Sequence, residues 1–120
     1  MNEEELKQRC KAMALRVIRL VMALPKNNVG AVLGKQLARS ATSVAANYRA
    51  TCKARSKADF LSKLGVVEEE ADETQLWIEL IIDSGIVRAS RAVNLLDEVK
   101  QLTAIFAASR ITARKNSAEL

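Results

Sequence analysis

The sequence predicts an all-α protein, an antiparallel up-down-up-down four-helix bundle formed by a single domain over residues 1–120. Three observations lead to this prediction. Apolar residues recur at helical spacing in four separate segments. Aromatic residues make up only 3% of the chain, and the unbranched or small apolar residues that dominate lose little side-chain freedom in a helix. One proline and four glycines are too few to supply the turns of an all-β chain.

The first two segments form a predicted helical hairpin. The first helix is expected over residues 3–24, because the residue before Pro25 is disfavoured in the α region. A turn follows, and the second helix is expected over residues 29–54. The buried stripe of the first helix is predicted at Leu6, Cys10, Met13, Val17, Leu20, Val21 and Leu24. That of the second is predicted at Leu33, Leu37, Ser40, Ala41, Val44, Tyr48 and Thr51.

The last two segments form the second hairpin. Ser56 followed three residues later by Asp59 resembles a capping box, so the third helix is expected over residues 57–84, with Gly85 as its left-handed C-cap. The fourth is expected over residues 88–113, followed by a frayed tail at 115–120. Their buried stripes are predicted at Phe60, Leu64, Val67, Ala71, Thr74, Ile78, Ile81 and Ile82, and at Ala92, Leu95, Leu96, Val99, Leu102, Thr103 and Phe106. Short connections between helices of similar length make antiparallel neighbours.

Charge is segregated along the chain. Every charged residue from Leu6 to Lys57 is basic, whereas Lys63 is the one basic residue between Asp59 and Asp83. In one interpretation, the third helix neutralises the first two within the bundle. In the other, a basic ridge on the second helix and its neighbours on the first bind the phosphates of RNA or DNA. The candidate nucleic-acid-binding residues are Lys35, Arg39, Arg49, Lys53, Arg16 and Arg19.

The third helix carries a second apolar face opposite its core stripe. The residues of this face are Val66, Glu69, Glu73, Leu76, Trp77 and Leu80. A helix with two apolar faces needs two partners, so we expect the outer face to be an oligomer interface. The alternative is a bundle twisted enough to bury part of this face internally. One arrangement pairs Glu69 and Glu73 with the basic ridge of the next subunit, a head-to-tail contact that closes into a ring.

No catalytic or metal-binding set is recognisable. Histidine is absent, which removes the commonest general base and the commonest metal ligand. Glu69, Glu70 and Glu73 lack the Glu-x-x-His motifs that complete a di-metal bundle. Cys10 and Cys52 have no zinc-site spacing and are predicted to be buried free thiols. We therefore expect no enzymatic activity, no catalytic residue, no metal and no cofactor.

The start of the chain, MNEEELKQRC, has no apolar segment. No stretch of the sequence approaches the roughly 18 uninterrupted apolar residues of a transmembrane helix. A cytoplasmic location without membrane association is expected.

An extended pattern covers the chain from about Leu15 to Val87. Its marks are a Ser-rich and Ala-rich stretch leading to Asn47-Tyr48-Arg49, the Arg55-Ser56 cap with Phe60, and Glu70, Asp72 and Glu73 before Trp77 and Ser84-Gly85. In these residues the chain resembles the bacterial four-helix bundle family first named from reading frames in intervening sequences of 23S ribosomal RNA genes. The resemblance implies a four-helix bundle without enzymatic residues, often assembled as a homopentamer. The family is also similar to the accessory protein of diversity-generating retroelements, which implies nucleic-acid binding and a reverse transcriptase as protein partner.

These observations predict a non-enzymatic oligomeric binding protein. It would engage RNA or DNA through a basic surface on the first two helices, as an accessory factor to a nucleic-acid enzyme. The alternative is a protein-interaction scaffold whose segregated charges serve subunit assembly, with no nucleic-acid binding.

Overall fold

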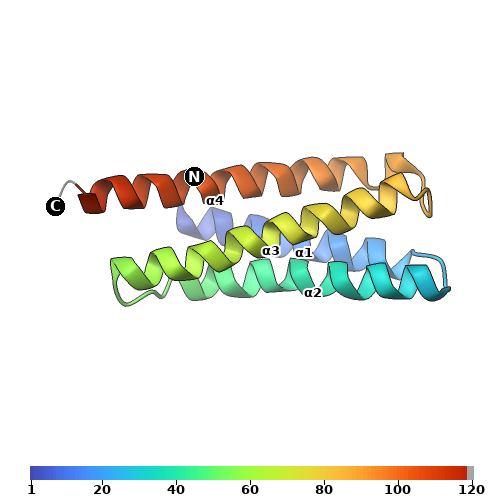
Figure 1. The fold of residues 1–120 in the computed structure, drawn as a ribbon, viewed down its shortest axis with the longest axis horizontal. Coiled ribbons are helices and arrows are strands. Elements are labelled where there is room, and N and C mark those ends of the chain that lie inside the picture. Colours follow the sequence, from blue (N-terminus) through green and yellow to red (C-terminus); the bar gives the residue numbers. More distant parts are fainter. Residues whose placement is uncertain (119–120) are drawn as a thin grey trace.

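The computed structural model describes residues 1–118, and Figure 1 shows its four long helices. They are α1 (Glu3–Met22), α2 (Asn28–Thr51), α3 (Lys57–Asp83) and α4 (Val93–Ala118), with a short 3-10 helix, η1 (Ala89–Arg91), before α4. Successive helices run antiparallel along a molecule of 53 × 21 × 20 Å. The described part of the chain contains no strand. The expected all-α, up-down-up-down bundle is confirmed.

Three of the helices begin at side-chain caps. The oxygens of Asn2, Asn27 and Ser56 each accept a hydrogen bond from a backbone N–H three residues later. At α3 the Asp59 carboxylate also accepts from the Arg55 N–H, at 3.2 Å. The Arg55–Asp59 and Asp59–Ser56 hydrogen bonds together fix the backbone at the start of α3. Gly85 follows the end of α3 with a φ of 75°, a left-handed conformation that glycine adopts without strain.

The first two helices end earlier than expected. α1 ends at Met22, and the next two N–H groups, of Ala23 and Leu24, bond to carbonyls three residues back. After Thr51, where α2 ends, the N–H of Cys52 still bonds four residues back, and those of Lys53 and Ala54 bond three residues back. Bonds of this spacing belong to the tighter 3-10 turn that commonly closes a helix. The closing turns cover Ala23 and Leu24 before Pro25, and Cys52 to Ala54 after α2, so the expected ends at residues 24 and 54 were two and three residues too late.

The fourth helix is displaced along the sequence from its expected position. It begins at Val93 and not at residue 88, because η1 occupies residues 89–91 and turns the chain into the bundle. It continues to Ala118, so the expectation of a frayed tail was wrong for residues 115–118. The rest of that predicted tail, residues 119 and 120, lies outside the described residues.

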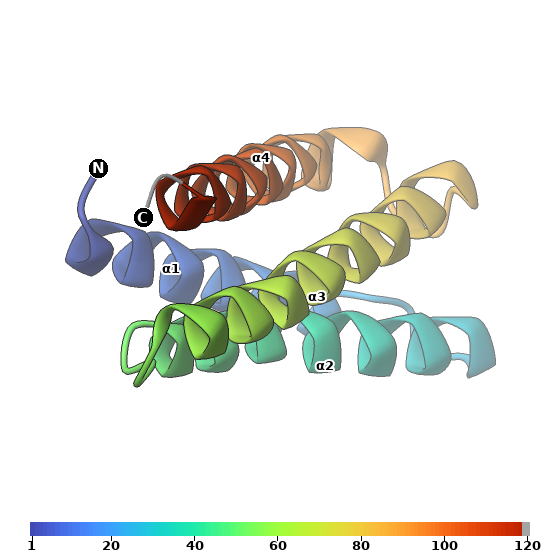
Figure 2. The same cartoon turned by 60° about the vertical axis from the view of Figure 1, so that its left-hand side comes forward.

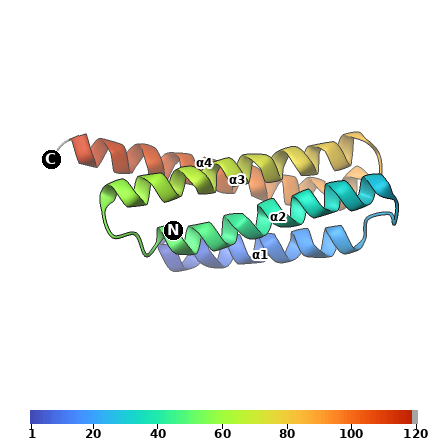
Figure 3. The same cartoon turned by 60° about the horizontal axis from the view of Figure 1, so that its bottom comes forward.

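The core runs along the inner faces of all four helices. The predicted stripes are buried, except that Val21, Leu33, Phe60, Ile82 and Thr103 are only partly so. The rings of Tyr48 and Phe106 meet with their centroids 5.7 Å apart. Each helix packs against the next one in the chain. The first and last helices, α1 and α4, are also adjacent, and theirs is the sparsest packing of the four adjacent pairs. Figures 2 and 3 show α1 and α3, and α2 and α4, as the diagonal pairs.

Candidate functional surfaces

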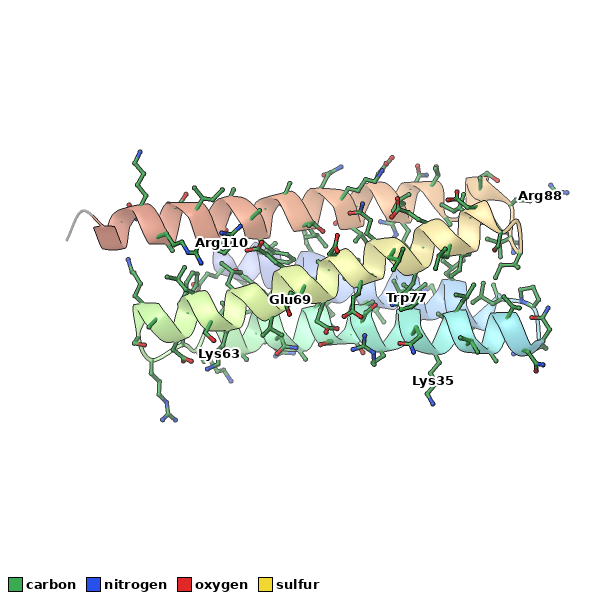
Figure 4. All side chains as sticks on the ribbon, viewed as in Figure 1. Lys35, Lys63, Glu69, Trp77, Arg88 and Arg110 are labelled. Atoms are coloured by element: carbon green, nitrogen blue, oxygen red, sulfur yellow. The ribbon has the colours of Figure 1, made fainter. Side chains whose placement is uncertain are left out.

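The predicted basic ridge of α2 lies on the surface of the bundle. Lys35, Arg39 and Arg49 are exposed on the side of α2 opposite its buried stripe, and Lys53 is exposed just after the end of α2. Figure 4 shows Lys35 projecting away from the other helices. A partner that approached α2 from outside would meet these four cations first.

Arg39 is already paired within its own chain. Its two terminal nitrogens lie 3.1 Å from a Glu70 carboxylate oxygen and 3.2 Å from a Glu73 oxygen, both on α3. The charge of Glu70, followed by its hydrogen bond and the contribution of Glu73, raises the pKa of Arg39. For this residue the third helix does neutralise the second within the bundle. Glu73 is therefore paired within its own chain, whereas Glu69 is exposed and forms no ion pair within residues 1–118.

The ridge continues across the groove between α2 and α1. Arg49 lines a hollow of about 240 Å³ together with Lys7 and Lys11 of α1. Lys7 is 3.7 Å from Glu4 in the first turn of α1, an exposed pair that contributes little. The residues that share this surface, here named the α1–α2 basic face, are Lys7, Lys11, Lys35, Arg49 and Lys53. Apart from Lys7, none of them forms an ion pair in the described part of the chain.

Arg16 and Arg19 belong to a different surface. They line a hollow with Ser90, Arg91 and Asn94, on the side of α1 that faces the start of α4. Arg16 is partly buried and Arg19 is exposed. The structure thus separates the six predicted basic residues into three on the outside of α2, one just after its end, and two at the α1–α4 corner.

Two further arginines tie α4 to its neighbours. Arg9 of α1 donates to both carboxylate oxygens of Glu98 on α4. Arg110 of α4 donates to Glu68 of α3, and Figure 4 shows Arg110 directed toward α3. The hydrogen bond to Glu98 is the main cause of the raised pKa of Arg9. Sequence reasoning missed both pairs, because charge segregation concerned only the first three helices. A helical wheel for α4 that placed Glu98 beside its apolar stripe would have been the available signal.

The outer face of α3 carries the predicted apolar residues in part. Val66, Leu76 and Leu80 are 41%, 47% and 40% exposed. Trp77 was expected to be exposed, but it is partly buried and packs against the core. Its indole Nε1 is buried and has no hydrogen-bond partner among the described residues. The exposed aliphatic part of this face is therefore Val66, Leu76 and Leu80, with the exposed Glu69 between them.

Sequence reasoning also missed apolar residues exposed on the other helices. Val32 on α2 is 60% exposed, and Leu15 and Met22 on α1 are 43% and 72% exposed. They stand outside the buried stripes that guided the prediction.

No group of three or more metal-ligating side chains comes together within residues 1–118. Burial raises the pKa of the Cys10 thiol to about 12, and Cys52 is partly exposed rather than buried as expected. None of the helices that the structure describes combines the length and apolar character needed to cross a membrane.

Fold and surface together define a small four-helix bundle whose distinctive features are charged and apolar outer faces. The chain matches the model of the 23S rRNA-intervening sequence protein family over residues 2–108, and it belongs to that family. A solved structure described as a protein of unknown function from the S23 ribosomal protein family of Bacteroides thetaiotaomicron is similar to it. The two share 28% sequence identity and a TM-score of 0.81, over 88% of this chain and 97% of the other. A search of curated proteins finds no match. The likeness to retroelement accessory proteins stays a prediction.

Proposed function

We propose that this protein is a non-enzymatic oligomeric binding protein that engages the phosphate backbone of RNA or DNA through the α1–α2 basic face. The carrying observation is that Lys11, Lys35, Arg49 and Lys53 are exposed without an ion-pair partner in the described chain. Glu4 lines the hollow beside Lys7, Lys11 and Arg49, and its one ion pair in the described residues is with Lys7. Glu70 and Glu73 pair with Arg39, at the α3 edge of the ridge.

The absence of aromatic residues from this face decides the mode of binding. Its cations contact phosphates, whereas sequence readout or base stacking needs side chains that reach base edges or stack on bases. A single copy with few phosphate contacts binds weakly. A ring-shaped oligomer such as a pentamer repeats the face several times on one particle, so avidity raises the overall affinity without new contacts. A protein of this kind suits the role of an accessory factor that presents nucleic acid to an enzyme such as a reverse transcriptase.

Salt dependence tests the proposal directly. Binding of fluorescent single-stranded and duplex RNA and DNA is measured by anisotropy between about 50 and 200 mM salt. We expect affinity to fall steeply, because each neutralised phosphate releases counterions. The variant R49Q/K53Q is expected to bind every sequence more weakly and to reduce the logarithmic salt slope by about one for each phosphate that is no longer neutralised.

A matched control is Lys100→Gln. Lys100 is exposed on α4, the helix diagonal to α2, so its loss removes one charge and leaves the proposed face unchanged. Binding that is insensitive to salt, or an equal loss of affinity in K100Q and in a single R49Q variant, would contradict the proposal.

A second candidate function is a protein-interaction scaffold, favoured by the aliphatic stripe on the outside of α3. Val66, Leu76 and Leu80 form an apolar surface of the kind that marks interaction sites. Here the variant L76S/L80S is expected to lower the particle mass measured by light scattering behind size exclusion. Ile111→Ser, at an exposed aliphatic residue of α4, is the control. An unchanged mass in L76S/L80S removes this stripe as a subunit interface.

A further inference from the structure

Three arginines open onto one hollow at the end of the bundle where α1 finishes and α4 starts. Arg16 and Arg19 come from α1, and Arg91 comes from η1. The hollow has a volume of about 430 Å³. Ser90 and Asn94 add polar side chains to its wall. Its floor is apolar, formed by the buried residues Leu20 and Leu95.

A second hollow of about 310 Å³ adjoins the first. The two share Ala23 and Arg91 in their linings, and the pair of neighbouring hollows is here named the arginine hollow. Arg88 lines the second part, beside Ile86 and Val87. Figure 4 shows Arg88 at the end of the bundle, on the connection between α3 and α4.

The positive charge of the arginine hollow has no counter-charge in the described residues. No carboxylate lines either part, and Arg16, Arg19, Arg88 and Arg91 form no ion pair within residues 1–118. Glu98, the acid that α4 directs at α1, is held by two hydrogen bonds from Arg9. Asp83, which ends α3, lines neither part.

Helix stabilisation explains only part of this cluster. Arg19 lies in the last turn of α1, where a cation is favourable. Arg88 and Arg91 precede the start of α4, where a cation is unfavourable, and the first turn of α4 holds no acid. Four cations that repel one another around a concave surface are the arrangement that a bound anion would stabilise.

We propose that the arginine hollow binds a phosphate group, carried either by a nucleotide or by the end of a nucleic-acid strand. The guanidinium fork matches two phosphate oxygens at once, which suits arginine to this chemistry better than lysine. Ser90 and Asn94 can donate further hydrogen bonds to phosphate oxygens. The apolar floor accepts the less polar part of the ligand, and the volume lies in the range of about 300–1,000 Å³ of small-molecule sites. This site shares no residue with the α1–α2 basic face.

Thermal unfolding of the full chain tests the proposal. The probes are inorganic phosphate, a nucleoside monophosphate and the matching nucleoside, each at constant ionic strength adjusted with chloride. We expect the two phosphate compounds to raise the Tm by about 11 °C at a hundredfold excess over the dissociation constant. The nucleoside should leave it unchanged. Equal Tm values in phosphate and in chloride of the same ionic strength would overturn the proposal.

The variant R16Q/R91Q locates the site. Arg91 is exposed and Arg16 is partly buried, and glutamine has a helical propensity similar to that of arginine. The Tm of the variant without ligand shows whether it still folds. We expect at least about tenfold weaker phosphate binding, because hydrogen bonds to charged groups are removed. The control K35Q/K53Q changes one residue on α2 and one just after its end, both outside the arginine hollow, and should bind phosphate as the parent does. Equal phosphate affinity in R16Q/R91Q and in the parent would refute the assignment.

Two comparisons distinguish the sources of the phosphate and keep this site separate from the proposed function. Tighter binding of the nucleoside monophosphate than of inorganic phosphate assigns a free nucleotide. Tighter binding of a 5′-phosphorylated oligonucleotide than of its 5′-hydroxyl form, abolished in R16Q/R91Q, assigns a strand end. If the α1–α2 basic face binds no nucleic acid, the Tm shift with inorganic phosphate remains. If the arginine hollow is wrong, R16Q/R91Q leaves that shift unchanged while R49Q/K53Q still weakens binding to long nucleic acid.

Discussion

Gly65 and Gly30 lie within helices in opposite surroundings, and alanine at the two positions should change stability in opposite directions. Gly65 is inside α3, and a Cβ added there meets no atom within 4 Å. Glycine inside a helix costs about 0.8 kcal/mol relative to alanine. Gly65→Ala should therefore raise the free energy of unfolding by about 0.8 kcal/mol. With an unfolding entropy of about 2.1 cal/mol/K per residue over 120 residues, this corresponds to a Tm about 3 °C higher.

Gly30 lies in the first turns of α2, against the connection from α1. A Cβ there would be 2.1 Å from the carbonyl oxygen of Pro25 and 3.2 Å from its carbon, both backbone atoms. The chain must shift, which also disturbs the 2.8 Å bond from the Gly30 N–H to the Asn27 cap. Overpacking costs about 1–3 kcal/mol and the loss of a cap about 1 kcal/mol, against a helical gain of about 0.8 kcal/mol. Gly30→Ala should therefore lower stability by about 1–3 kcal/mol.

Urea unfolding followed by circular dichroism measures both effects. Gly65→Ala should raise the midpoint and Gly30→Ala should lower it, each with an unchanged m-value. The two sites are in different helices and share no neighbouring atom, so the double variant should show the sum of the two changes. A Gly30→Ala variant as stable as the parent would refute the close approach of Pro25 to α2. A destabilised Gly65→Ala variant would refute the open space beside α3.

Two further predictions concern the charged pair between α1 and α4 and the two thiols. Glu98→Gln removes the carboxylate bound by Arg9, and both side chains are mostly shielded from solvent. The free energy of unfolding, measured in urea, should fall by about 1 kcal/mol. An unchanged value would show that the pair contributes nothing to stability. At pH 8, iodoacetamide should modify the partly exposed Cys52 and leave the buried Cys10 intact, as judged by peptide mass spectrometry, and equal labelling would contradict the burial of Cys10. Because burial raises the pKa of Cys10 from 9.0 to about 12, the folded state favours the thiol, so its contribution to stability is full below pH 9 and is lost as the pH rises toward 12.

The sequence alone determined the fold class and nearly all of the core. Side chains that repeat every three or four residues face one side of a helix whatever surrounds it, so the spacing of Val17, Val44, Ile78 and Val99 was enough to place them inside. The start of α3 was also predictable from the sequence, because a helix cap depends on residues within one turn. The start of α4 was not predictable in this way, because Ala92 before it offers no capping side chain and η1 displaces the helix.

Only the tertiary structure decided which charges meet. A helical wheel gives the direction of a side chain relative to its own core stripe, but not the neighbour or the register that it encounters. Arg39 was correctly placed on the outside of α2, but its pairing with Glu70 depends on the register in which α3 packs against α2. Arg91 fell within the expected fourth helix and was not a predicted site residue, and only the fold places it in the same hollow as Arg16 of α1. The physical reason is the same in both cases: burial is set by local periodicity, whereas electrostatic partners are set by the relative positions of whole helices.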